Sequence, residues 1–467
     1  MAQLHDLEAH AQAAALRKGD LDPRELAAHY LARIAALDGG IGAFVEVTDA
    51  AARDRAETLA QDAPAGVLWG LPLADKDLVA RAGVPTRYGS RARRDHVPGH
   101  TDELAAALDE AGAVSLGKTA TPEFGLTGYT ETSFTPPTRD PWDPRHGSGG
   151  SSGGAAAAVA AGLVPIAPGS DGGGSIRIPA ATVGVVGLKP SRGRLPIGSG
   201  IDSFAGLAVT GPLARTVADA AFLTDALRGL RPHPFALAAP PAAALLPAAL
   251  AHGAGPLRVG VTTVSPWDDD EQIDLDRDAR AAVDVAARML SAAGNGVDDL
   301  DWRPRGYAAM FRTIWRASAA RLPLSGADLA LVEPITAWLV REGRSLRATD
   351  LLGALDAASL FERETIAALS PVDAVLTPAL AQTPRPIGWF DRDDAERNFA
   401  QQVRYAPYSS FVNVAGLPAI VVPVTTGTGG HPVSVQLVGR PGGEAALVGL
   451  AAQLETARGP LPHPPVW

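Results

Sequence analysis

Two segments rich in glycine and serine lie close together in this sequence, and they constrain the fold more than any other feature. The first is Gly149–Gly154 (GGSSGG) and the second is Gly169–Ser175 (GSDGGGS). Between them, Ala155–Ala161 is alanine apart from one valine, which predicts a helix able to pack closely against its neighbours. Val164–Ala167 then predicts a buried strand. Glycines are typical of turns and serines of helix caps, so neither segment alone requires a catalytic role.

Strand and helix patterns alternate along the rest of the chain. Residues 1 to about 60 have apolar residues at helical spacing, and Asp22-Pro23 is typical of a helix start. Leu257–Thr262 predicts a strand, 276–293 a helix, and the residues after it another strand, which is a βαβ pattern. Further strands are predicted near 71–79, 113–116, 374–377 and 419–424, and helices at 103–111 and 306–369. We therefore expect an α/β fold with a central mixed β-sheet flanked on both faces by helices.

Bulk properties of the chain disfavour several classes of protein. The net charge of -10 repels phosphate backbones, so we expect no nucleic-acid partner. The absence of cysteine excludes disulfides, thiol nucleophiles and cysteine-ligated zinc. The apolar stretch Phe235–Ala251 is interrupted by three prolines and predicts no membrane span. Met1–His10 lacks the apolar run of a secretory signal, so the expected location is the cytoplasm.

Two local motifs match known binding patterns but lie in the wrong context. Gly112–Thr119 fits the phosphate-binding P-loop pattern, yet its middle residues Ala113–Leu116 predict a strand, and Pro122 follows soon after the lysine. His96 and His100 are four residues apart, but a proline and a glycine lie between them and prevent a shared helix face. We therefore expect neither a nucleotide site nor a metal site.

Taken together, the two glycine-serine segments match a long and specific pattern. GGSSGG, an alanine-rich stretch and then Asp171–Ala180 (DGGGSIRIPA) resemble the defining segment of the amidase signature family, and Ser151 and Ser175 have the family spacing of 24 positions. Leu71–Asp77 (LPLADKD) is similar to the segment that carries the catalytic lysine of the family. Similar stretches recur over nearly the whole chain, at 117–124, 140–142, 187–194, 210–215, 413–419 and 436–439, although Asp140 stands where the family usually has asparagine.

The resemblance implies a catalytic triad of Ser175, Ser151 and Lys76. A serine hydroxyl is a weak nucleophile until a base takes its proton. In the family, the serine that corresponds to Ser175 attacks the substrate carbonyl. The serine that corresponds to Ser151 follows a cis peptide bond and relays the proton. The lysine that corresponds to Lys76 accepts this proton. A free lysine has a pKa of about 10.4, so burial must lower the pKa of Lys76 if it is to act as a base.

The glycine run before the nucleophile predicts an oxyanion hole. Without Cβ atoms, the backbone can direct the N–H groups of Gly172, Gly173, Gly174 and Ser175 toward one point. Asp171 and Arg177 are expected to hold this loop through charged hydrogen bonds rather than to touch the substrate. Ser152 is expected to support the loop or to cap the alanine-rich helix.

The expected function is hydrolysis of a linear amide through an acyl-enzyme, with no metal or organic cofactor. The chain should act on a small-molecule amide or carbamate, as a monomer or a homodimer. Aromatic residues in three regions suggest an apolar or aryl substrate: the stretch after Lys118, the helices of 306–369 and a loop at 384–408. These candidate pocket residues are Tyr129, Phe134, Trp315, Trp389 and Tyr405, together with Phe390. Core packing explains each of them equally well. We favour an aryl acylamide, with urethane bonds as an extension.

The family also includes an alternative of another kind, the glutaminase-type A subunit of the glutamyl-tRNA amidotransferase. That protein works only within a complex and supplies ammonia to a partner. The present sequence matches the shared core and has no clear partner-binding extension. We expect four parts within a single domain spanning 1–467: N-terminal helices (1–65), a catalytic core (66–230), a Pro/Ala-rich connection (231–256), and the rest of the core with its substrate-pocket helices (257–467).

Overall fold

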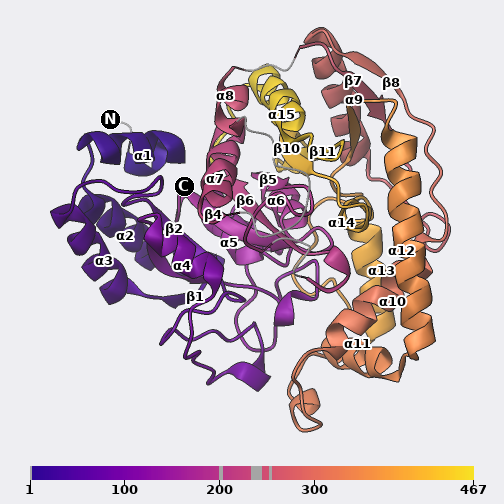
Figure 1. Ribbon diagram of the computed structural model, residues 1–467, viewed down its shortest axis with the longest axis horizontal. Coiled ribbons are helices and arrows are strands. Elements are labelled where there is room, and N and C mark those ends of the chain that lie inside the picture. The colour runs from indigo at the N-terminus through magenta and orange to yellow at the C-terminus, as the bar shows by residue number, and fades with distance from the viewer. Residues whose placement is uncertain (1–2, 199–202, 233–243, 252–254) are drawn as a thin grey trace.

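An eight-stranded mixed sheet forms the centre of the computed structural model, which describes residues 3–198, 203–232, 244–251 and 255–467 (Figure 1). Neighbouring strands are antiparallel except for β9–β7 and β7–β8, which are parallel. In spatial order the strands are β4 (Ile166–Asp171), β6 (Val209–Ala214), β5 (Val186–Lys189), β10 (Ala419–Thr426), β11 (Pro432–Gly439), β9 (Ala374–Pro378), β7 (Arg258–Val261) and β8 (Gly296–Asp299).

Helices cover both faces of this sheet, so the prediction of a mixed sheet within one α/β domain is confirmed. α7 (Val217–Gly229), α9 (Arg277–Ala292) and α15 (Glu444–Arg458) pack on one face, and α5 (Gly153–Ala160) and α6 (Arg177–Val183) pack on the other. The middle strands consequently have few exposed residues, and β9 is buried along its whole length. A strand covered on both sides has no solvent face and can be apolar at nearly every position.

A second, three-stranded sheet lies against the first and was not predicted. β3 (Val114–Thr119) pairs in parallel with β2 (Pro72–Lys76) and antiparallel with β1 (Phe44–Val47). The N-terminal region was expected to be helical only. It contains the helices α1 (Ala9–Lys18), α2 (Pro23–Ile41) and α3 (Asp49–Gln61), but β1 lies between α2 and α3. The predicted start of α2 is confirmed, because the Asp22 side chain accepts a hydrogen bond from Arg24 N–H.

Helix α5 lies between the two sheets and is buried at every residue. Only small residues fit such a position. A Cβ atom added to Gly154 would lie 2.3 Å from the backbone nitrogen of Ala120 and 2.5 Å from the carbonyl oxygen of Ala43. The alanine-rich sequence therefore allows the sheets to approach each other with the helix between them.

A group of helices from the second half of the chain forms the side of the molecule coloured orange in Figure 1. It comprises α10 (Tyr307–Ala320), α11 (Pro334–Ser345), α12 (Ala348–Leu369), α13 (Ala395–Tyr405) and α14 (Ser410–Val414). The prediction of a loop throughout 384–408 is wrong, because α13 occupies much of it. Its polar sequence forms a helix with one buried face, which includes Asn398, Phe399 and Val403.

Two further elements, α4 and α8, complete the α-helices of the described ranges. α4 (Glu103–Glu110) ends just before Gly112, which has a positive φ of 88°, as the sequence suggested. Residues 231–256, predicted as a connection, are described only in part, and that part contains α8 (Leu245–Leu250), which packs against α7 and α15. Within the described ranges, no helix has the length and apolar character needed to cross a bilayer.

Candidate active site

Lys76 ends strand β2 and points into the interior between the two sheets. Its side chain donates hydrogen bonds to Ser151 Oγ at 2.7 Å and to Ser170 Oγ at 3.0 Å, and the residue is 2% exposed. Burial lowers the pKa of Lys76 to about 7, although the negative charge of Asp171 acts in the opposite direction. A large fraction of this lysine is therefore neutral, and able to accept a proton, near pH 7.

The first glycine-serine segment brings Ser151 to Lys76. It forms the turn before α5, and the Gly150–Ser151 peptide bond is cis. Close packing fixes this turn, since a Cβ atom on Gly150 would lie 2.8 Å from the backbone nitrogen of Tyr129. Ser152 joins the two segments: its N–H donates to the carbonyl oxygen of Ser175 at 3.1 Å, and its hydroxyl donates to that of Ser170 at 3.4 Å. Ser152 thus supports the loop that carries Ser175 through two hydrogen bonds to its backbone.

Ser175 lies in the loop between β4 and α6, at the wall of a pocket. An ion pair between Asp171 and Arg177 spans this loop, with Nη2–Oδ1 at 2.9 Å and Nε–Oδ2 at 3.0 Å. Both residues are almost fully buried. Arg177 also donates to Gln436 Oε1, and Asn413 donates to the Asp171 carbonyl oxygen. The loop is consequently held by bonds to strand β11 and helix α14.

The charge of Asp171 is stabilised by these partners. Burial alone would raise the pKa of its carboxyl group, but the adjacent Arg177 guanidinium, with help from Lys189 and Asn413, holds the pKa well below its usual range. Asp171 also accepts the N–H groups of Gly174 (2.8 Å) and Ile176 (3.1 Å). It remains ionised across the neutral pH range and fixes the backbone around Ser175.

The backbone donors of the loop divide into two groups. Gly174 N–H is engaged by Asp171. The N–H groups of Gly172, Gly173 and Ser175 donate to no acceptor within the described part of the chain. Gly172 lies beside Trp315, and Gly173, which lines the pocket, lies beside Phe311 and Trp315. Of the four predicted oxyanion-hole residues, these three have N–H groups available to a ligand.

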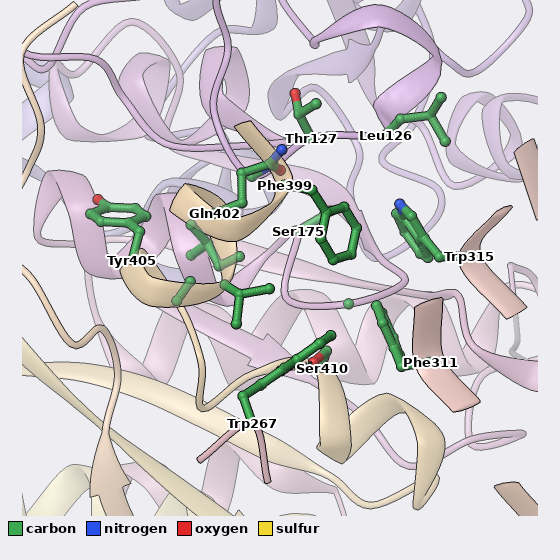
Figure 2. Close-up of a pocket in the computed structure, with 15 residues that line it drawn as sticks. Leu126, Thr127, Ser175, Trp267, Phe311, Trp315, Phe399, Gln402, Tyr405 and Ser410 are labelled. Atoms are coloured by element: carbon green, nitrogen blue, oxygen red, sulfur yellow. Dashed lines mark hydrogen bonds between the residues drawn. The ribbon is translucent and has the colours of Figure 1, made fainter. Parts of the chain in front are cut away.

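The pocket next to Ser175 has an apolar and aromatic lining (Figure 2). Among the described residues, no charged side chain lines it. Two of the predicted pocket residues, Trp315 and Tyr405, belong to the lining, and all three predicted regions contribute to it. The lining residues are Leu126, Thr127, Gly128, Gly173, Ser175, Ile178, Trp267, Phe311, Trp315, Phe399, Gln402, Val403, Tyr405, Ala406 and Ser410.

Four other aromatic residues from the prediction lie outside the lining. Tyr129 stacks on Phe390 with ring centroids 4.1 Å apart, and its hydroxyl accepts a hydrogen bond from Asn398. Trp389 packs edge-on against Phe390 at 4.9 Å. Phe134 is half-buried in a loop and does not belong to the lining. Tyr129, Phe390 and Trp389 therefore form an aromatic packing cluster.

Sequence reasoning missed three aromatic residues of the lining: Trp267, Phe311 and Phe399. Phe311 precedes Trp315 by four residues, so the two share one face of α10 and their rings stack at 5.5 Å. Phe399 has the same relation to Val403 on α13. Helical spacing could have identified both. Trp267 follows a proline in a loop, and no sequence pattern marked it.

The motifs set aside at the sequence level have structural explanations. Lys118 lies on strand β3, is fully buried and donates to the carbonyl oxygen of Val79. His96 contacts the carbonyl oxygen of Thr86. Among the described residues, one group has three potential metal ligands, Glu8, His10 and Asp219. The oxygens of Asp219 already accept the N–H groups of Ala9 and His10.

Comparisons with known proteins agree with this geometry. The family described as Amidase matches residues 25–448. AmiB2 of Mycobacterium tuberculosis, which carries the name of a putative amidase, is 38% identical over 464 residues, covering 96% of each chain. The A subunit of glutamyl-tRNA(Gln) amidotransferase from Synechococcus sp. is 38% identical over 477 residues, covering 95% of each chain. Among solved structures, 6-aminohexanoate cyclic dimer hydrolase with its substrate superposes with a TM-score of 0.90 at 30% identity, covering 99% of this chain and 100% of the other.

Fold, site and relatives together define the class of this protein: it is an enzyme that hydrolyses amide C–N bonds. Within that class, the chain belongs to the amidase signature family. The family prediction made from the two glycine-serine segments is confirmed.

Proposed function

We propose that the protein hydrolyses small-molecule amides through an acyl-enzyme on Ser175, with Ser151 as proton relay and Lys76 as base. The observation that carries this proposal is the hydrogen bond of 2.7 Å between Lys76 Nζ and Ser151 Oγ, in a buried site where the lysine pKa falls to about 7. No described hydrogen bond joins the hydroxyls of Ser151 and Ser175. Catalytic hydrogen bonds are often long without substrate and shorten when it binds.

The proposed reaction conserves protons at each step. Ser175 Oγ attacks the carbonyl carbon, its proton passes to Ser151, and the Ser151 proton passes to Lys76. The N–H groups of Gly172, Gly173 and Ser175 stabilise the negative oxygen of the tetrahedral intermediate. The proton then returns through Ser151 to the leaving nitrogen as the C–N bond breaks. Water attacks the acyl-enzyme by the same route and releases the acid.

The pocket supports a neutral, apolar substrate, and we favour an aryl acylamide. Aromatic rings from Trp267, Phe311, Trp315 and Phe399 offer flat apolar surface, and the described lining has no charge to pair with an ionised substrate. A carbamate presents the same carbonyl carbon to Ser175, so urethane bonds are a natural extension. The name of the 6-aminohexanoate cyclic dimer hydrolase shows that one structural relative acts on a non-aromatic amide.

Release of nitroaniline tests this function. The wild-type protein should release dye from a short-acyl nitroanilide, and the ratio to its carbamate analogue ranks amide against urethane cleavage. Ser175→Ala should abolish release, because the proposed acyl-enzyme cannot form without this hydroxyl. Ser359→Ala, which removes an exposed hydroxyl on α12, is the matched control and should keep the wild-type rate. Dye release that survives Ser175→Ala contradicts the proposal.

A second candidate, the glutaminase component of a tRNA-dependent amidotransferase, is favoured by the 38% identity to the A subunit of that enzyme. Glutamine carries an α-ammonium and an α-carboxylate group, and each needs a charged partner when it leaves water. The described pocket lining offers none. We therefore expect no glutaminase activity, with or without the other amidotransferase components from a related organism. Glutaminase activity that appears only with those components favours the second candidate.

A further inference from the structure

Ser410 places a hydroxyl group in the mainly apolar and aromatic lining of the pocket. It begins helix α14, is 5% exposed and lines the same pocket as Ser175. Figure 2 shows it beyond the Ser175 loop, next to the ring of Trp267. A Cβ atom added to Gly173 would lie 3.8 Å from Ser410 Cβ, so this serine is adjacent to the proposed oxyanion hole. A substrate positioned for attack by Ser175 can therefore extend to Ser410.

Two donors occupy the oxygen of this hydroxyl. Trp267 Nε1–H donates to Ser410 Oγ at 3.3 Å, and an indole nitrogen can only donate. The Tyr307 hydroxyl donates to the same oxygen at 2.8 Å. Tyr307 is 1% exposed, and its hydrogen has no other acceptor among the described residues. A hydroxyl oxygen has two lone pairs, so both acceptor positions of Ser410 are filled.

The hydrogen of Ser410 consequently has no acceptor within the described protein. No described hydrogen bond has Ser410 Oγ as its donor. Because Ser410 lines the pocket, a ligand bound there can accept this hydrogen, whereas the neighbouring rings of Phe311, Trp315 and Phe399 offer no acceptor. A buried donor without a partner is costly, and it acquires one when a ligand brings an acceptor.

We propose that Ser410 is a specificity residue that donates a hydrogen bond to a neutral acceptor, an ether or carbonyl oxygen, in the part of the substrate that lies along the aromatic wall. The inference rests on the function proposed above. The acceptor is neutral because no cation lines the described pocket, and a carboxylate buried there would lose its hydration without a counter-charge. The preferred substrate thus has two polar points: the scissile carbonyl group and a second oxygen.

Matched substrates test this inference on the wild-type protein. A hexanoyl nitroanilide is compared with analogues in which one chain methylene after another, from the second after the carbonyl carbon onward, is replaced by an ether oxygen. The analogue whose oxygen reaches Ser410 should have a kcat/KM about 5- to 10-fold above that of the hexanoyl compound, the value of one hydrogen bond to a buried donor. If every ether analogue is equal to or poorer than the hexanoyl compound, the inference is overturned.

Two variants identify the donor. Ser410→Ala should reduce the preference for the ether analogue to about 1-fold, since the donor is gone. Thr127→Val removes another hydroxyl of the same lining, but that hydroxyl already donates to the carbonyl oxygen of Tyr129 at 3.0 Å. It should keep the wild-type ratio between the two substrates. A preference that persists in Ser410→Ala assigns it to another donor and overturns the inference.

The two proposals fail in different ways. If Ser175-dependent release occurs from the hexanoyl compound without any ether preference, the function stands and the role of Ser410 does not. If no anilide is cleaved, the proposed function fails, and the affinity of the protein for each uncleaved compound then tests the role of Ser410. Fluorescence of the pocket residues Trp267 and Trp315 can follow binding of each uncleaved compound to Ser175→Ala. Tighter binding of one ether, lost on adding Ser410→Ala, supports the inference, and equal affinities overturn it.

Discussion

At the scale of single residues, the proposed mechanism depends on the buried amine of Lys76. A lysine in water is protonated at neutral pH, whereas burial between the two sheets brings the pKa of Lys76 to about 7. Asp171 opposes this effect, but its charge is largely compensated by Arg177. In the proposed mechanism, the neutral lysine accepts the proton that Ser151 passes on. The same residue would then set both the basicity of the site and the pH dependence of hydrolysis.

The pH dependence of hydrolysis follows from this pKa. Below about pH 7 Lys76 is protonated and cannot act as base, so kcat/KM should rise through pH 7 and level off above about pH 8. Lys76→Ala should lower kcat/KM by about 10²- to 10⁴-fold and remove the inflection. The measurement is a pH–rate profile of nitroaniline release. A flat wild-type profile between about pH 5.5 and 8.5, or an inflection kept by the variant, would show that another group is the base.

Some residue roles could be predicted from the sequence and others could not. The segments around Lys76, Ser151 and Ser175 have distinctive sequences, and the structure brings the first two into contact. The engagement of Gly174 N–H by Asp171 depends on backbone angles that three successive glycines leave open. Aromatic residues such as Trp267 and Trp389 look alike in sequence, because packing between elements decides which of them faces a cavity.

At the scale of elements, helix α5 determines how closely the two sheets approach. It carries the Ser151 turn at its start and contacts both β2, which ends in Lys76, and β4, which ends in Asp171. Its Gly154 lets the helix backbone lie against the backbone of Ala120 and Ala43, which flank the small sheet. The distance between Lys76 and the Ser175 loop is thus set by the small size of the α5 side chains.

One extra methyl group on α5 should be poorly tolerated. Gly154→Ala places Cβ against backbone atoms of Ala120 and Ala43, which side-chain rotation cannot relieve, so the free energy of unfolding should fall by about 1–3 kcal/mol or more. Gly353→Ala is the matched control. Gly353 lies in α12 with no atom within 4 Å of an added Cβ, and alanine there should stabilise the protein by about 0.5–1 kcal/mol. Urea denaturation measures both changes, and equal effects of the two substitutions would refute the packing argument.

Strand prediction failed at several strands, for different reasons. β6 contains Gly211-Pro212, a pair typical of turns, yet it pairs with β4, where Pro168 lies opposite Pro212. β1 is short and lies within a region dominated by helical spacing. β11 was missed although Val433, Val435 and Leu437 alternate with polar residues, a period-two pattern that was present in the sequence. β7, β9 and β10 have compact apolar runs and were predicted close to their observed bounds.

At the scale of the whole molecule, the site is assembled from segments far apart in the chain. Lys76 comes from the small sheet, Ser151 and Ser175 from the two glycine-serine segments, and the pocket from α10, α13, α14 and the loop that carries Trp267. The sequence pattern predicted the central sheet and its flanking helices. It did not predict the separate three-stranded sheet, because β1 lies in a region of helical spacing and local patterns do not show which strands pair.

Direct detection of the acyl-enzyme tests the central claim. The protein is mixed with an excess of an aryl carbamate, whose carbamoyl-enzyme hydrolyses slowly, quenched in acid, digested and analysed by mass spectrometry. The account predicts that the mass of the carbamoyl group appears on the peptide containing Ser175, at Ser175 itself, and that Ser175→Ala remains unmodified. Turnover of the carbamate with no adduct on Ser175, or an adduct on Ser151 in its place, would contradict it.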